Sequence, residues 1–277
     1  MSIVLYWRRI PKPIGGLIDT DTSPKVILPT APRAWAYMSP SDGAARLFGP
    51  DVRLRNLMAL AKYGPLRLRD LRRVTGATTV HTEGRDYAPF GRADLVRTWG
   101  AGRDRTAMLD PNFPVALPLR ILLIALERAY PLPPQTLIPA PLELPAMRPW
   151  KGDKLALFGS PIPTAILTSI GVMGWTFEAL CVEVATGYDR VVVKKVIRRL
   201  EDEGVLQGDR DRKPGFNVRV LTISNEFPAH EELLGLLKAC VVAWPHVGSK
   251  VEHAMAQLSA RTKEHLRRRG LMPSTQI

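Results

Sequence analysis

The side chains best suited to bind a charged ligand gather in one stretch, "YDRVVVKKVIRRLEDEGVL", residues 188–206. Placing these residues at the 100° steps of a helix puts a cationic face opposite an apolar stripe. The cationic side chains are Arg190, Lys194, Lys195, Arg198 and Arg199, with Arg190 and Arg199 at the margins of the face. Ammonium and guanidinium groups form charge-assisted hydrogen bonds with phosphate oxygens, so the stretch predicts a contact with a phosphate-bearing polyanion.

Residue types that carry out catalysis form no such pattern. The sequence contains no P-loop, no dinucleotide-binding fingerprint, no HExxH helix and no GxSxG turn. The five histidines do not share metal-ligand spacing, and Cys181 and Cys240 lie in apolar helical patterns that predict buried thiols. We therefore predict no catalytic activity, no metal site and no cofactor.

The overall charge narrows the class of partner. The 277 residues include 39 Lys and Arg against 26 Asp and Glu, a formal net charge of +13. Such an excess favours nucleic acid over an anionic membrane as the partner. The opening apolar run is shorter than a signal-peptide core, and the run at 121–126 is far below the roughly 20 residues that span a bilayer. We expect a soluble, cytoplasmic protein.

The chain repeats itself. "LFGP" at 47–50 returns as "LFGS" at 157–160, and "DPNFPVALPLRILLIALERAYP" at 110–131 returns as "SNEFPAHEELLGLLKACVVAWP" at 224–245. The matches keep the same order in both copies, and the offset drifts only from 110 to 114 residues. Collinear matches at a nearly constant offset indicate two copies of one structural unit.

The stretch that joins the copies, residues 131–150, carries seven prolines. Proline lacks an amide donor and fixes φ, so this stretch is predicted to be a semi-rigid spacer that is neither helix nor central strand. The predicted parts of the chain are an extended N-terminal arm at 1–45, a first domain at 46–131, a Pro-rich linker at 132–150, a second domain at 151–245, and a basic C-terminal helix and tail at 246–277.

The second copy shows its elements more clearly than the first. Its apolar spacing predicts three helices that each end at a glycine, with Asp189 as the N-cap of the third. The apolar stripe of that third helix is predicted to contain Val192, Val193, Val196, Ile197 and Leu200. After Gly204 the apolar period changes toward 2, which predicts a hairpin, and a helix from Pro228 to about Val242 follows.

This order of elements, with "LFGS" at its start and "RRLEDEGVL" leading into the hairpin, resembles the winged helix-turn-helix domains of ArsR- and MarR-type bacterial transcription regulators. The resemblance implies a mainly α fold with small β-hairpins (α+β), made of two winged helix-turn-helix domains in tandem with pseudo-twofold symmetry. It also implies that the third helix enters the major groove of double-stranded DNA, while the hairpin, or wing, lies along the backbone. The implied DNA-binding residues of this copy are Arg190, Val191, Lys194, Lys195, Arg198, Arg199, Arg210, Arg212 and Lys213.

The residues fit that geometry on physical grounds as well. A helix in a groove needs long cationic side chains that reach phosphates and a few groups that touch base edges. Lys194, Lys195 and Arg198 meet the first need. Val191 faces outward on the first turn and has the chemistry to touch a thymine methyl group.

The first copy keeps an opening helix at 53–64, a second helix at 67–76 and a hairpin at 95–109, but its recognition segment differs. Gly84 and Pro89 interrupt any helix there, which predicts either a very short helix or a loop. The copy is then either degenerate and kept for packing, or specialised for its own contact. The cationic residues that it offers for such a contact are Arg85, Arg92, Arg97, Arg103 and Arg105, and the predicted DNA-binding residues among them are Arg85, Arg97, Arg103 and Arg105.

Three functions remain open at this point. The first is a transcription regulator, in which the fused copies imitate a twofold dimer with the helices at 114–130 and 228–242 as its seam, or in which two chains form a homodimer. The second is a winged-helix subunit that binds a protein partner in a larger complex. The third is the replication initiator of a mobile element, which would bind short direct repeats.

Overall fold

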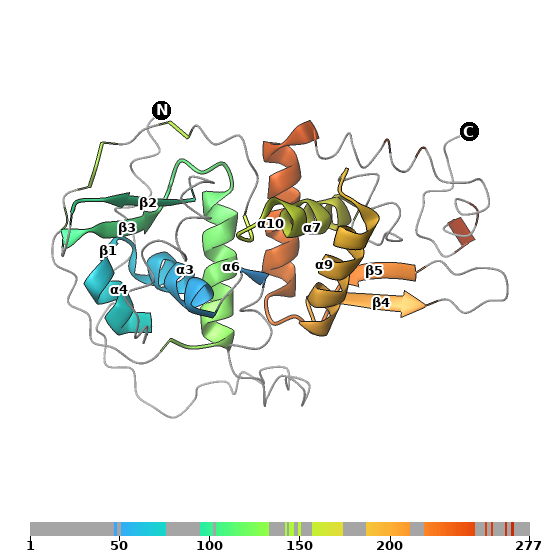
Figure 1. Ribbon diagram of the computed structural model, residues 1–277, viewed down its shortest axis with the longest axis horizontal. Coiled ribbons are helices and arrows are strands. Elements are labelled where there is room, and N and C mark those ends of the chain that lie inside the picture. The colour runs from blue at the N-terminus through green and yellow to red at the C-terminus, as the bar shows by residue number, and fades with distance from the viewer. Residues whose placement is uncertain are drawn as a thin grey trace, which may run out of the picture.

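The computed structural model describes residues 47–48, 51–75, 95–101, 104–132, 142, 144–146, 149–150, 157–173, 187–210, 219–246, 253, 256, 264 and 267–268. Over these residues the fold mixes six helices with five short strands, and all strand pairing is antiparallel (Figure 1). This composition agrees with the expected α+β class. No helix in these ranges is long and apolar enough to cross a membrane.

The element order is similar in the two halves of the chain. The first half contains α3 (Asp51–Tyr63), β1 (Leu66–Arg67), α4 (Leu68–Thr75), β2 (Val96–Trp99), β3 (Thr106–Leu109) and α6 (Ala116–Ala129). The second half contains α7 (Pro161–Met173), α9 (Arg190–Asp202), β4 (Leu206–Arg210), β5 (Arg219–Ile223) and α10 (His230–Ala243). The predicted helices at these places are confirmed. The predicted helix that ends at Gly187 and the recognition segment of the first copy lie outside the described residues.

Both predicted hairpins are confirmed. Strand β2 pairs with β3 with Val96 opposite Leu109, and β4 pairs with β5 with Leu206 opposite Ile223. The first half adds β1, which pairs with β3 and gives a three-stranded sheet of order β1-β3-β2. Two residues are too short a run to produce a periodic signal, so the sequence could not predict this strand.

The backbone repeats its geometry where the sequence repeats. The Phe113 amide donates to the Asp110 carbonyl at 3.1 Å, and the Phe227 amide donates to the Ser224 carbonyl at 3.1 Å. The two following helices also end alike, because Tyr130 and Trp244 each donate at 2.8 Å to the carbonyl four residues earlier. The same hydrogen bonds around different side chains support the interpretation that one unit occurs twice.

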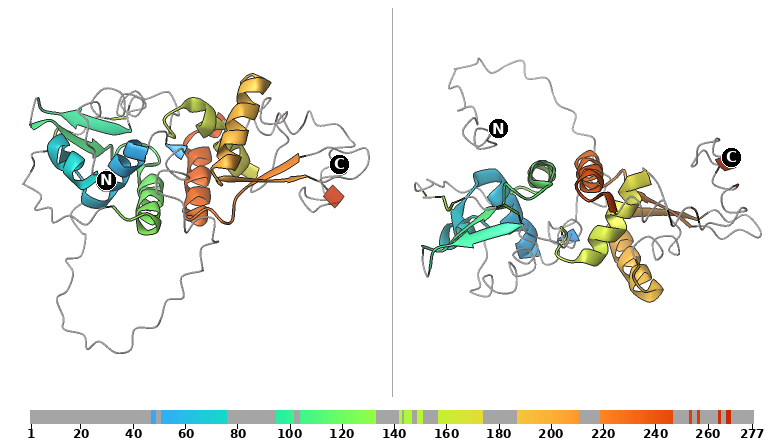
Figure 2. Two further views of the ribbon diagram at one scale, coloured as in Figure 1. Left: turned by 60° about the horizontal axis from the view of Figure 1, so that its bottom comes forward. Right: turned by 90° about the horizontal axis from the view of Figure 1, so that it is seen from above.

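Helices α6 and α10 lie side by side at the centre of the molecule, which confirms the predicted contact between them (Figures 1 and 2). They run antiparallel, because the ring of Phe113, just before α6, lies 5.9 Å from the ring of Trp244 at the end of α10. Trp150 from the Pro-rich linker completes the cluster, 5.8 Å from Phe113 and 6.0 Å from Trp244. The linker is thus fastened to both halves by edge-on aromatic contacts.

The repeated LFG segments also meet each other. The rings of Phe48 and Phe158 contact edge to face at 5.3 Å between centroids. Gly159 has φ of +74°, and a β-carbon there would lie 3.2 Å from the Phe48 carbonyl oxygen. Glycine at this place therefore permits both the left-handed turn and the close approach of the first LFG segment.

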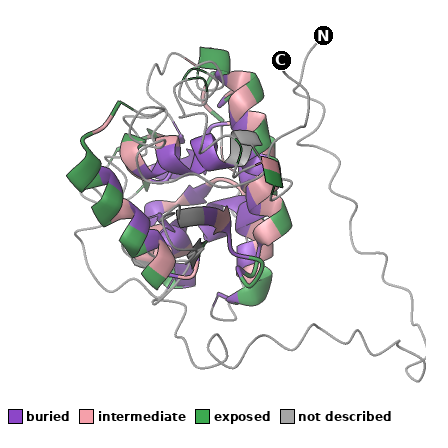
Figure 3. Ribbon diagram, turned by 90° about the vertical axis from the view of Figure 1, so that its right-hand side faces the viewer, coloured by how far each residue is buried: buried purple, intermediate pink, exposed green. Residues whose placement is uncertain are grey.

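One hydrophobic core runs through both halves. Four buried positions of α6 correspond to four of α10, and the same cluster includes the LFG segments. The buried residues of the two helices are Leu119, Leu122, Leu123, Leu126, Leu233, Leu236, Leu237 and Cys240. Figure 3 shows that buried residues line the inner sides of the packed helices, while exposed residues lie on their outer sides. The halves thus share their core.

We predict that Phe48 and Phe158 are energetically coupled. Phe48→Leu and Phe158→Leu each keep apolar volume but remove a ring, so the double-mutant cycle should show a coupling free energy of about 0.5–1.5 kcal/mol. The measurement is the free energy of unfolding in urea. Losses that simply add would contradict a direct contact between the two repeats.

We also predict that stability falls above pH 9. Burial raises the pKa of the Cys240 thiol to about 12 from its ordinary 9.0, with a smaller opposing influence from Thr168. Between those pH values the unfolded chain binds fewer protons than the folded chain, so the free energy of unfolding falls as pH rises, by at most about 1.4 kcal/mol per pH unit. Burial also raises the pKa of Tyr130, to about 12, which acts in the same direction above pH 10.

The measurement is urea unfolding at several pH values between 8.5 and 11 in the wild type and in Cys240→Ala. The variant should lose less stability per pH unit, because it lacks the thiol that ionises in the unfolded chain and stays protonated in the folded chain over most of this pH range. Equal slopes in both proteins would show that this thiol does not control the alkaline loss.

Candidate nucleic-acid interface

Helix α9 begins at a well-formed cap. A side-chain oxygen of Asp189 accepts hydrogen bonds from the backbone amides of Val191 at 2.8 Å and Val192 at 3.4 Å. Gly187, two residues earlier, has φ of +71°, a conformation that glycine adopts without strain. The N-cap predicted from the sequence is therefore confirmed, and the direction in which α9 leaves the preceding turn is fixed.

The helix ends just as sharply. The Val205 amide donates to the Leu200 carbonyl at 2.8 Å, and the Gly204 amide donates to the Glu201 carbonyl at 2.9 Å. This pair of bonds, with Gly204 at φ of +66°, is a Schellman motif. Val205 and Leu200 are both fully buried, which supplies the apolar contact that accompanies such an ending. Both ends of α9 are thus determined by local sequence.

The inner side of α9 packs on α7 and β4 through Val193, Ile197 and Leu200, which are buried. Val196 is half-buried against the same core. The prediction that Val192 belongs to this stripe is wrong, because Val192 is 38% exposed and does not join the core cluster. A stripe of five apolar residues is wider than the surface that α7 and the hairpin cover.

The outer side of α9 carries the predicted cations, and all five are exposed: Arg190, Lys194, Lys195, Arg198 and Arg199. We call these residues the cationic ridge. The Arg199 guanidinium lies 3.5 Å from the Glu203 carboxylate, whose side chain is fully buried. Within the described part of the chain, no acidic side chain forms an ion pair with the other four.

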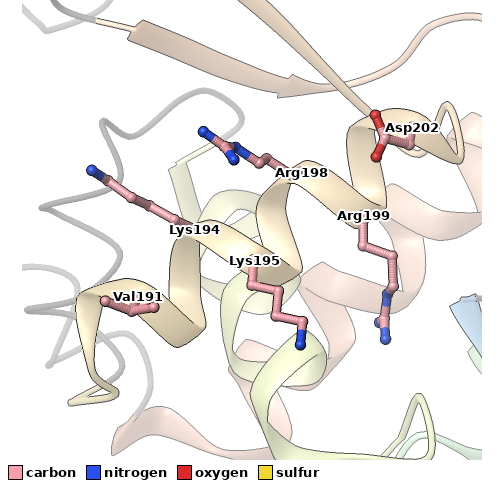
Figure 4. Close-up of a pocket in the computed structure, with 6 residues that line it drawn as sticks. All are labelled: Val191, Lys194, Lys195, Arg198, Arg199 and Asp202. Atoms are coloured by element: carbon pink, nitrogen blue, oxygen red, sulfur yellow. The ribbon is translucent and has the colours of Figure 1, made fainter.

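The ridge has two edges. Figure 4 shows Lys194 and Arg198 extending to one side of the helix axis, while Lys195 and Arg199 extend to the other. With Val191 and Asp202 they line an open hollow of about 440 Å³. Val191, 73% exposed, lies at the N-terminal end of this surface. The arrangement puts a short apolar side chain on the first turn and long cationic side chains on both edges behind it.

The remaining predicted residues of the second copy lie in or beyond its hairpin. Arg210 is the last residue of β4, opposite Arg219 in the register. Arg212 and Lys213 lie outside the described residues, and so do Arg85 and Arg103 of the first copy. The structure therefore gathers six of the predicted residues, Val191 and the five cations, on α9.

The first copy uses one of its predicted arginines differently. The Arg97 Nε donates to an oxygen of the Asp110 carboxylate at 2.6 Å, and the two side chains are 18% and 1% exposed. An ion pair this enclosed is costly to break, because either partner alone would leave an uncompensated charge. Arg97 therefore links β2 to the turn after β3. Arg105 is half-buried just before β3, where its carbonyl accepts from the Leu68 amide at 2.8 Å.

The role of Asp110 was missed from the sequence, although the repeat contained the signal. Asp110 and Ser224 occupy matching places, and each accepts from a backbone amide two residues on: Asn112 at 2.9 Å and Glu226 at 3.2 Å. Short polar side chains commonly cap turns in this way. Comparing the two copies at this position would have identified a structural turn residue.

The described residues contain no group of three His, Cys, Asp or Glu side chains that could hold a metal ion. Compared with protein-family models, with curated proteins and with solved structures, the chain matches none. The candidate function is therefore inferred from the geometry of the cationic ridge itself.

We predict that the Asp189 cap stabilises the fold. Asp189→Ala removes the acceptor of two backbone amides and should lower the free energy of unfolding by about 1 kcal/mol. Asp189→Asn keeps an oxygen acceptor and should recover most of that loss. The measurement is urea unfolding, and equal losses in both variants would contradict a capping role.

Proposed function

We propose that this protein is a sequence-specific, double-stranded DNA-binding transcription regulator with two winged helix-turn-helix domains in tandem. The observation that carries the proposal is the cationic ridge on α9. Its cations are exposed on a helix whose opposite side is buried. Four of them have no acidic partner among the described residues.

The dimensions of α9 suit the major groove of B-DNA. That groove is about 12 Å wide and admits one α-helix, whose diameter with side chains is about 10–12 Å. Cations on both edges of the helix then face a phosphate backbone on either side. Lys194 and Arg198 would contact one strand, and Lys195 with Arg199 the other (Figure 4).

The order of elements supports the winged-helix interpretation. In the first half, α3, β1 and α4 precede a β2–β3 hairpin, and β1 pairs with β3. In the second half, α9 leads directly into the β4–β5 hairpin, which would serve as the wing. In this proposal α9 is the recognition helix and Arg210 begins the wing contacts.

The packing of the two halves supports a pseudo-dimer within one chain. Winged-helix regulators bind two half-sites as twofold dimers, and here α6 packs on α10 while the LFG segments meet each other. Contacts between matching parts of two units are typical of a twofold interface. Because the first copy carries Arg97 in a core ion pair, the two half-sites would be recognised by different residues.

A protein partner is the second candidate, and one observation favours it. Leu117 and Ile121 on α6 are 67% and 49% exposed, and Val242 on α10 is 81% exposed. The contact of Phe113 with Trp244 places these residues at the same end of the helix pair. Leu117 and Ile121 lie one turn apart on α6, and neighbouring exposed aliphatic side chains are typical of protein-binding surfaces. Such a surface would lie on different helices from the ridge, so it is compatible with DNA binding.

We predict that the ridge controls the salt dependence of duplex binding. Each phosphate contact contributes about one unit to the slope of log K against log salt concentration. Lys194→Ala with Arg198→Ala should weaken binding to duplex DNA and make the slope shallower by about two. The measurement is a fluorescence-anisotropy titration with the full chain at four or more salt concentrations.

The matched control is Lys238→Ala with Arg128→Ala, which removes one exposed lysine and one exposed arginine from α10 and α6. It changes the net charge equally and should leave the slope almost unchanged. The same loss in both double variants would show a general charge effect, and no loss in the ridge variant would place the DNA contact elsewhere.

A further inference from the structure

Two adjacent valines are exposed on the first turn of α9. Val191 is 73% exposed and Val192 is 38% exposed, and neither belongs to the hydrophobic core cluster. Valine is a weaker helix former than alanine. At Val191 this loss of helix stability is not offset by burial of the side chain. Packing within the chain therefore does not account for Val191, and its exposed side chain is available for a contact outside the chain.

The residue types on the ridge limit how α9 can distinguish bases. Between Arg190 and Asp202 the helix has no Asn, Gln, Ser or Thr. Bidentate amide contacts to adenine are therefore excluded for this helix. What remains for base edges is guanine contact by arginine or lysine, cytosine contact by an acidic side chain, and apolar contact with the C5-methyl group of thymine, which projects into the major groove. The acidic side chains of α9, Glu201 and Asp202, lie in its last turn, so the first turn is left with the apolar contact.

The reach of the side chains separates these tasks. Valine is short and touches a base only where the backbone comes close to the groove floor, whereas lysine and arginine extend to the phosphates. In helix-turn-helix docking the N-terminal residues of the recognition helix contact the base edges. Val191 lies on that first turn, and the cations of both edges follow it along the helix (Figure 4).

We infer that Val191, with Val192 beside it, is a specificity-determining residue that recognises the C5-methyl group of thymine. This inference rests on the proposed DNA-binding function and extends it to a base preference. The first turn of α9 would then select a thymine in the half-site that the second copy binds, while the cationic ridge supplies affinity that does not depend on sequence.

The test uses the full chain and duplexes that it enriches from a random-sequence pool. In an enriched duplex each thymine is replaced in turn by deoxyuridine, which removes the methyl group and keeps the base pair. We expect at least one replacement to weaken binding about fourfold, the value of burying one methyl group. Replacement by 5-bromodeoxyuridine, whose bromine is close to a methyl group in size, should restore the affinity.

The protein side of the test is Val191→Ala. In this variant the sensitive deoxyuridine replacement should lose most of its effect, because the methyl group has already lost its contact. The matched control is Val242→Ala, the same change at a valine of α10 that is 81% exposed. That variant should keep the full fourfold response.

The outcomes separate the two proposals. If the chain enriches no duplex, the proposed function fails. If a duplex is enriched but no deoxyuridine replacement weakens its binding, the thymine inference is overturned and DNA binding stands. A deoxyuridine effect that is equally large in wild type and Val191→Ala would also overturn it, because the methyl group would then be recognised by another residue.

Discussion

The burial of α6 against α10 is the constraint on which the rest of the molecule depends. Each helix carries four buried positions, and the apolar cluster that contains them continues from one half of the chain into the other. Each helix also packs within its own half, α6 on α3 and α10 on α7, so these side chains are enclosed from both sides. The aromatic contacts of Phe113, Trp150 and Trp244 close one end of this seam and attach the linker to it.

A fixed seam gives the second half a fixed outer surface. Helix α9 carries three like-charged pairs at i,i+4 spacing, Arg190 with Lys194, Lys194 with Arg198, and Lys195 with Arg199, and each costs about 0.2–0.5 kcal/mol. Burial of Val193, Ile197 and Leu200 stabilises the helix by about 1.5–3 kcal/mol per side chain, which outweighs the repulsion. The fold thus tolerates a cationic surface in which Arg199 pairs with Glu203 and the other four cations have no acidic partner among the described residues.

The two halves share a backbone plan and differ in chemistry at matching places. Asp110 and Ser224 hold the same turn, but only Asp110 also binds an arginine of the neighbouring strand. The repeated LFG segments still contact each other through Phe48 and Phe158. The phenylalanines through which the halves meet are thus kept in both copies, while the buried turn residue, Asp110 in one copy and Ser224 in the other, has diverged. A duplicated unit in one chain can diverge in this way, because each copy has its own sequence.

The sequence by itself determined the features that local interactions control. Asp189 and Gly204 set the ends of α9, and the change of apolar period marked the hairpin of the second copy. The internal repeat indicated the hairpin of the first copy and the contact of α6 with α10. Tertiary structure decided what depends on the shape of the neighbouring surface. Helical periodicity assigned Val192 to the core, but α7 and β4 do not extend far enough to cover it. In "LEDEG" three acids stand in a row, and only packing selects Glu203 as the buried one. Periodicity gives the direction in which a side chain points, whereas its burial depends on which residues, distant in sequence, reach that place.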